Sequence, residues 1–195
     1  MNKKIYALFA LMLLGTTMFI TSCSNDDDND TDQNWITFQD AEFQKVATNT
    51  AQYTKLKSQS DNGYVYWQPS TAITDSDLSS RITAQGTPEF TDTVVIRYEG
   101  WYVDQQGKKY IFDSTESPSL SNTSNPNKTP VQFAVNGLID GFSTLLQDMK
   151  VQDERLVVIP QQLGYGSSKT TYIPAYTTLW FRVKLVKIIP LNGRK

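Results

Sequence analysis

The fold of the C-terminal half is decided by the stretch Asn136-Gly137-Leu138-Ile139-Asp140-Gly141-Phe142 and by the residues that follow it, Ser143-Thr144-Leu145-Leu146-Gln147-Asp148-Met149-Lys150. Phe142, Leu145, Leu146 and Met149 recur at the i, i+3, i+4, i+7 spacing of one apolar helix face. This spacing predicts a helix over about 142–150, and Asp140 stands where an N-terminal cap belongs. A helix with one apolar face needs another element to cover that face.

The flanking segments predict an antiparallel sheet against which this helix can pack. Near the C-terminus an apolar series alternates with a mostly polar one, namely Leu179, Phe181, Val183 and Leu185 against Trp180, Arg182, Lys184 and Val186. This alternation indicates a strand with one buried face and one wet face, as antiparallel sheets commonly have. Residues 93–102 are β-branched and aromatic, and residues 104–107 turn them into a second strand over 109–112. The predicted fold class is therefore α+β.

Six short motifs follow one another through the same region. They are Val95-Ile96-Arg97-Tyr98-Glu99-Gly100, Phe112-Asp113-Ser114, the stretch 136–142, Val158-Ile159-Pro160, Gly164-Tyr165-Gly166 and Tyr172-Ile173-Pro174. Together they resemble the FKBP-type peptidyl-prolyl cis/trans isomerases over roughly 93–189. The resemblance implies a strongly curved antiparallel half-barrel wrapped around one short helix. It also implies an enzyme without a cofactor, proline-containing polypeptide clients and macrolides as possible inhibitors.

The resemblance further implies a pocket with eight catalytic residues, mostly aromatic or apolar: Tyr98, Phe112, Asp113, Ile139, Phe142, Tyr165, Ile173 and Phe181. In this interpretation Phe142 forms the floor and Asp113 forms hydrogen bonds at the rim. Tyr165 offers its hydroxyl, and Ile173 its backbone N–H, to the substrate.

Three further residues are expected to contact the substrate: Leu138 at the entrance, Val131 and Tyr172. A plainer alternative is that the aromatic and aliphatic residues only fill the core and that Asp113 is a turn or cap residue. Tyr165 favours function, because it stands between two glycines in a polar loop.

The chain also departs from the family pattern. Phe142 replaces the usual tryptophan, and Val131 stands where an aromatic residue often follows the family's proline. These changes predict a more open pocket and weaker macrolide binding. The usual glycine after the helix is missing from 151–154, and Tyr176 replaces the usual asparagine or histidine. The segment 114–129 is longer than in minimal members and predicts a mobile loop beside the cleft.

Composition restricts the possible chemistry. The chain has no histidine and a single cysteine, which excludes a Ser-His-Asp triad, a Cys-His dyad and an ordinary zinc site. Isomerisation of an X-Pro bond needs no nucleophile, because an apolar cleft that fits the twisted amide lowers the barrier by differential binding. The formal net charge of −2 provides no basic footprint for nucleic acid.

The N-terminus predicts a lipoprotein signal peptide over residues 1–22. Lys3 and Lys4 precede an apolar run over 5–20, which is short for a spanning helix of about 20 residues. Ile20-Thr21-Ser22-Cys23 resembles a bacterial lipobox, so Cys23 is the predicted lipid attachment site, and the predicted location is the outer membrane. The alternative is an ordinary secreted protein with a stray cysteine.

Residues 23–34 are predicted to form an acidic, disordered tether, because the stretch after Cys23 contains no apolar residue and cannot bury surface. This tether is either a solvated spacer or a signal that exports the lipoprotein to the cell surface. The choice between the cell surface and the periplasmic face therefore stays open.

The middle of the chain divides into a predicted N-terminal helical extension over 35–62 and an isomerase domain over 63–195. Residues 35–57 carry apolar residues at a loosely helical spacing, residues 61–63 predict a turn and residues 64–67 a strand. Residues 69–86 indicate a loop with at most a short strand around Ile82. The extension either packs on the barrel or mediates dimerisation, so the chain is a monomer or a dimer.

The leading functional hypothesis is an active prolyl isomerase that assists the folding of exported proteins. An alternative from another class keeps the fold as a non-catalytic binding or holdase module on the cell surface. A purely structural surface lipoprotein would leave the Gly-Tyr-Gly and Ile-Pro loops unexplained.

Overall fold

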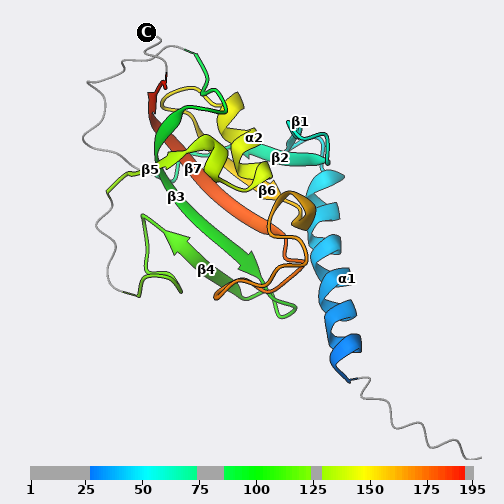
Figure 1. The fold of residues 1–195 in the computed structure, drawn as a ribbon. Helices are drawn as coiled ribbons and strands as arrows, with labels where there is room; N and C mark the ends of the chain where they lie inside the picture. The colour runs from blue at the N-terminus through cyan, green and yellow to red at the C-terminus, as the bar shows by residue number, and fades with distance from the viewer. Residues whose placement is uncertain (1–26, 74–85, 124–128, 192–195) are drawn as a thin grey trace, which may run out of the picture.

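A seven-stranded antiparallel sheet forms the framework of the computed structural model, which describes residues 27–73, 86–123 and 129–191 (Figure 1). The strands are β1 (Thr54–Lys57), β2 (Tyr64–Pro69), β3 (Thr93–Val103), β4 (Lys109–Ser114), β5 (Val131–Ala134), β6 (Glu154–Ile159) and β7 (Leu179–Ile189). They are ordered β1-β2-β6-β7-β3-β4, and β5 also pairs with β3. Among the described strands β1 and β4 are the two ends of this order, so the sheet is open. The predicted α+β fold with an antiparallel sheet is confirmed.

The predicted helix is α2 (Asp140–Asp148), which contacts β1, β2 and β6. Its four stripe residues are at most 4% exposed, and three of them are completely buried. The prediction that Asp140 caps the helix is wrong, because Ile139 occupies the N-cap position. Asp140 lies instead in the first turn, where a carboxylate interacts favourably with the helix dipole, and it accepts hydrogen bonds from the hydroxyls of Ser60 and Thr144.

The long strand β7 confirms the predicted alternation up to Leu185. The register with β3 then shifts, because Val95 pairs with Lys187 and Ile96 with Leu185. This bulge leaves Val186 without an opposing residue and buries it, so its predicted position on the wet face is wrong. Beyond the bulge Ile188 faces the core and Lys187 is exposed.

The N-terminal region differs from its prediction at both ends. The helix α1 (Asp27–Ala47) begins inside the segment predicted to be a disordered tether. Acidic residues favour the N-terminal turns of a helix, and adding turns to an existing helix costs little. At the other end Thr54–Lys57 is strand β1 rather than helix, and it pairs with β2 around the predicted turn, where Asp61 and Gly63 have positive φ.

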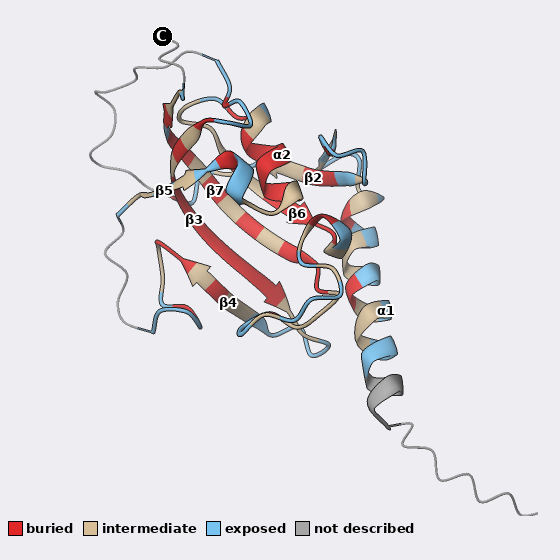
Figure 2. Cartoon of the chain, in the orientation of Figure 1, coloured by how far each residue is buried: buried red, intermediate tan, exposed pale blue. Residues whose placement is uncertain are grey.

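The helix α1 packs beside the sheet, as Figures 1 and 2 show. Near its C-terminal end Phe43 and Val46 join a small apolar cluster with Tyr66 of β2 and Val158 of β6. Near its middle the Trp35 ring meets the Tyr102 ring of β3 edge-on. Of the two expectations for the extension, packing on the sheet is therefore observed, and dimerisation stays a prediction.

Several sequence predictions lie outside the described residues. They concern the signal peptide over residues 1–22, lipid attachment at Cys23 and a short strand around Ile82. Within the described parts of the chain no helix is long and apolar enough to cross a membrane. The short 3-10 helices η1 (Val135–Gly137) and η2 (Gln161–Leu163) complete the description of the secondary structure.

Candidate functional site

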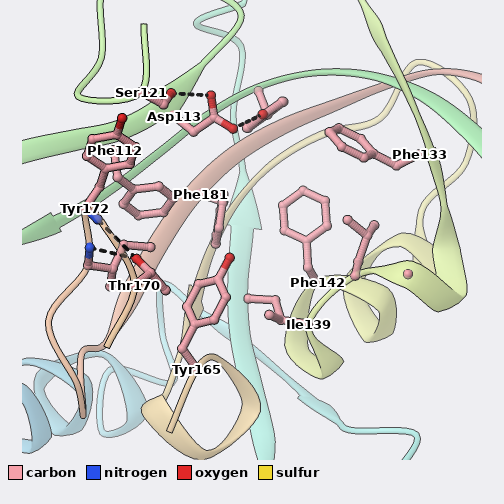
Figure 3. A pocket seen from close by; sticks show the side chains of 14 residues that line it. Phe112, Asp113, Ser121, Phe133, Ile139, Phe142, Tyr165, Thr170, Tyr172 and Phe181 are labelled. Carbon is pink, nitrogen blue, oxygen red and sulfur yellow. Dashed lines mark hydrogen bonds between the residues drawn. The ribbon is translucent and has the colours of Figure 1, made fainter. Parts of the chain in front are cut away.

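A pocket of about 350 Å³ opens where the N-terminal end of α2 faces strands β3, β4 and β7 and the segment after η2 (Figure 3). Its lining is predominantly aromatic and aliphatic: Tyr98, Phe112, Asp113, Ser121, Phe133, Gly137, Leu138, Ile139, Phe142, Tyr165, Thr170, Tyr172, Ile173 and Phe181. All eight residues predicted to be catalytic are in this set, together with Leu138 and Tyr172. The structure therefore brings together residues that lie up to 83 positions apart in the sequence.

Three phenylalanines form the apolar wall and floor. The Phe181 ring of β7 meets the Phe142 ring of α2 edge-on at 4.8 Å and the Phe112 ring of β4 at 5.4 Å between centroids. Edge-to-face contacts of this kind stabilise the cluster beyond what the burial of apolar area contributes. Figure 3 shows these rings around one space, with Tyr165 reaching toward it from the opposite loop.

On the side of the pocket formed by β5, the structure differs from the expectation for Val131. Phe133 lines the pocket, and its ring meets the Tyr98 ring at 6.0 Å, whereas Val131 packs against the core without lining the pocket. Residues two apart on a strand share a face, so the aromatic group missing at 131 is supplied from 133. The prediction that Val131 lines the pocket is therefore wrong, and an aromatic ring occupies the side that was expected to be more open.

The Asp113 carboxylate accepts hydrogen bonds from three donors within the protein. These donors are the Tyr98 hydroxyl, Ser121 Oγ at 2.9 Å and the Ser114 backbone N–H at 2.9 Å. Burial and the hydrogen bond to Asp113 raise the pKa of Tyr98 well above its ordinary value of 10.0. Tyr98 is consequently neutral at physiological pH.

Tyr165 is one of the polar groups of the pocket that remain available to a ligand. Its side chain is 40% exposed, and its hydroxyl forms no hydrogen bond within the described part of the chain. Partial burial, followed by the negative charge of Asp113, raises the pKa of Tyr165 above 10.0. The hydroxyl therefore keeps its proton and can donate it in a hydrogen bond.

The backbone donor predicted at Ile173 is already used. Its N–H donates to Thr170 Oγ1 at 2.9 Å, so the prediction that it is offered to the substrate is wrong. The Ile173 side chain is 5% exposed and still lines the pocket. A different backbone group is open: among the described residues no acceptor takes the N–H of Ile139, which stands at the N-cap of α2.

Four residues that line the pocket were not predicted from the sequence: Ser121, Phe133, Gly137 and Thr170. Strand alternation after Val131 could have indicated Phe133. Ser121 and Thr170 carried no such signal, because polar residues are common in both loops. Searched over the described ranges, the chain holds no cluster of three or more His, Cys, Asp or Glu residues that could bind a metal ion.

Residues 85–186 match the family model described as FKBP-type peptidyl-prolyl cis-trans isomerase. Because this match covers just over half of the 195 residues, the chain belongs to the FKBP-type isomerase family.

Two Escherichia coli (strain K12) proteins are among its relatives. The FKBP-type 22 kDa peptidyl-prolyl cis-trans isomerase is 33% identical over 120 residues, which is 60% of this chain and 52% of that protein. FkpA is 32% identical over 103 residues, which is 53% of this chain and 33% of FkpA. The chain thus matches about half or less of the length of these relatives.

The crystal structure of FkpA from Escherichia coli is similar in fold. The two structures give a TM-score of 0.59 at 23% sequence identity, and the similarity covers 84% of this chain and 64% of the FkpA chain. At this identity the similarity concerns the fold alone.

Proposed function

We propose that this chain is a peptidyl-prolyl cis/trans isomerase that acts on proline-containing polypeptides. The observation that carries the proposal is the composition of the pocket, where the Phe181 ring packs against both Phe112 and Phe142 and Tyr165 presents an available hydroxyl. Membership of the family and the FKBP fold support it.

The pocket suits a reaction that makes and breaks no covalent bond. Rotation about an X-Pro bond has a barrier of about 20 kcal/mol, because it disrupts amide resonance. The planar amide is the more charge-separated form, so an apolar surface that removes water from it favours the twisted form. Each tenfold increase in rate needs about 1.4 kcal/mol of such preference.

Two donors can orient the substrate in this pocket. The Tyr165 hydroxyl keeps its proton, and the Ile139 N–H lies at the N-terminal end of α2, where the helix dipole favours a partial negative charge. Either donor can hold a substrate carbonyl while the proline ring lies among the phenylalanines. Asp113 acts through Tyr98, because it holds the phenol of that wall residue in place.

Tyr165→Phe tests the part played by the hydroxyl. The substitution removes one hydrogen bond, worth about 0.5–1.5 kcal/mol net, so kcat/KM for an X-Pro peptide should fall by about tenfold or less. A protease-coupled isomerisation assay on the purified protein measures this change. The matched control is Tyr64→Phe on β2, because Tyr64 is also 40% exposed and does not line the pocket.

The same assay on the wild-type protein distinguishes an active isomerase from a non-catalytic binding or holdase module. If the wild-type protein is folded and yet accelerates no X-Pro peptide above the uncatalysed rate, the isomerase proposal fails and the binding or holdase module replaces it. Equal losses in the Tyr165 and Tyr64 variants would contradict the assigned role of the Tyr165 hydroxyl.

We further propose that the clients are exported proteins, because the N-terminal residues resemble a lipoprotein signal that ends at Cys23. Acyl chains contribute about 0.8 kcal/mol per buried methylene, which holds a multiply acylated protein on a membrane. Cys23→Ser should therefore move the protein from the membrane fraction to the soluble fraction, as detected by immunoblotting. Ser24→Ala should leave it on the membrane, and retention of the Cys23 variant at the wild-type level would contradict lipid anchoring.

A further inference from the structure

The helix α1 lies outside the family-matched residues 85–186. It nevertheless forms hydrogen bonds with segments that adjoin the pocket. The first of these contacts involve Gln39, a polar residue that is completely buried. Its side-chain amide donates to the Val103 carbonyl at the end of β3 at 2.9 Å and accepts from the Thr178 N–H, just before β7, at 3.0 Å. The Thr178 hydroxyl also donates to the backbone carbonyl of Gln39 at 3.0 Å.

A second contact is made by Trp35, one helical turn earlier in α1. The indole N–H of Trp35 donates to the Ala175 carbonyl at 2.9 Å. The Trp35 ring also packs edge-on against Tyr102 of β3, with 6.1 Å between the ring centroids. Trp35 and Gln39 are four residues apart, so they lie on the same face of the helix. This face of α1 therefore forms hydrogen bonds with two residues of the segment 175–178, namely Ala175 and Thr178.

The held segment is continuous with residues that line the pocket. The Tyr176 N–H, next to Ala175, donates to the Gly166 carbonyl at 2.7 Å, and Gly166 directly follows Tyr165. Ile173, two residues before Ala175, is closed into a tight turn by hydrogen bonds in both directions with Thr170. A displacement of residue 175 would consequently be transmitted to Ile173 on one side and to Tyr165 on the other.

We propose that α1 is a positioning element of the isomerase site, in which Trp35 and Gln39 hold the segment 165–178 against the ends of β3 and β7. The proposal rests on the proposed isomerase function. Neither residue lines the pocket, so both act through the loop rather than on the substrate. The apolar cluster at Phe43 and Val46 attaches the helix to the sheet at a separate place, so the contacts of Trp35 and Gln39 with the loop can be altered independently of it.

Trp35→Phe is the informative variant, because it keeps an aromatic ring near Tyr102 and removes the hydrogen bond to Ala175. The matched control is Phe43→Leu, which trims the same helix at its contact with Tyr66, away from the loop. At a temperature where both variants are fully folded, kcat/KM of the Trp35 variant should fall measurably, by at most about tenfold, which is the loss expected if the whole contribution of the hydrogen bond is felt at the site. The Phe43 variant should keep the wild-type value.

Hydrogen exchange provides a measurement that does not require activity. The amides of Thr170 and Tyr176 donate hydrogen bonds within the loop, and the amide of Gly166 donates to the Gln161 carbonyl of η2. All three should exchange faster in the Trp35 variant than in the Phe43 variant. Gln39→Met, which keeps the chain length and removes the amide, should produce the same pattern. If Gln39→Met fails to fold, Trp35→Phe decides the question alone.

The outcomes separate the two proposals. An inactive wild-type protein would overturn the isomerase function, whereas exchange would still report whether α1 holds the loop. Unchanged exchange over 166–176 in the Trp35 variant, or equal acceleration in the Trp35 and Phe43 variants, would overturn the positioning role. An unchanged kcat/KM together with faster exchange would also overturn it, because the loop would then move without consequence for the site.

Discussion

Replacing Phe181 with alanine should lower the free energy of unfolding by about 3–5 kcal/mol, the usual cost of removing a buried phenylalanine. The side chain is 6% exposed and touches the rings of both Phe112 and Phe142. The same change opens the pocket between its wall and its floor. Isomerase activity should consequently fall far more than it does in the Tyr165 variant, even at temperatures where the protein is folded.

Urea denaturation followed by tryptophan fluorescence measures the stability of this variant, and the peptide assay measures its activity. Phe90→Ala is the control, because Phe90 is 54% exposed, and such a change should stay within about 0.5 kcal/mol. A stable Phe181 variant with full activity would show that the three phenylalanines are not the reacting surface.

Gly100→Ala should lower both stability and activity, because its added methyl group would overlap with the rings that form the same wall of the pocket. A Cβ at residue 100 would lie 2.6 Å from Phe181 Cε1 and 2.7 Å from Phe112 Cε2. Both rings must then move, and moving them into the pocket narrows it. Overpacking of this kind costs about 1–3 kcal/mol, and kcat/KM should fall by at least about tenfold, as expected when 1.4 kcal/mol or more of the preference for the twisted amide is lost.

Gly137→Ala serves as the matched control, since no atom lies within 4 Å of a Cβ built at that position. It should change neither stability nor activity substantially, although Gly137 also lines the pocket. Equal effects at the two glycines would contradict the claim that the position of the Phe112 and Phe181 rings controls the reaction.

The sequence predicted those elements whose burial follows a simple period. The apolar stripe of α2 and the alternation of β7 up to Leu185 are local patterns, and both appear in the structure. Beyond Leu185 the prediction failed, because the bulge at Val186 arises from the register with β3 rather than from β7 itself. The N-terminal boundary of α1 was missed for a related reason: an acidic segment disfavours a packed core but does not prevent helical turns from extending a helix that is already docked.

For the site, the resemblance of the sequence motifs to the FKBP family predicted which side chains gather, and ten of the eleven predicted pocket residues line the cavity. It also determined, through the absence of histidine, that any catalysis proceeds without imidazole. Only the tertiary structure decided which polar groups remain available. The Ile173 N–H is taken by Thr170, whereas no described residue accepts from the Ile139 N–H. Likewise, Phe133 rather than Val131 reaches the Tyr98 ring, and α1 holds the loop at Ala175. These features depend on hydrogen bonds and contacts between segments far apart in the chain, and no local period encodes them.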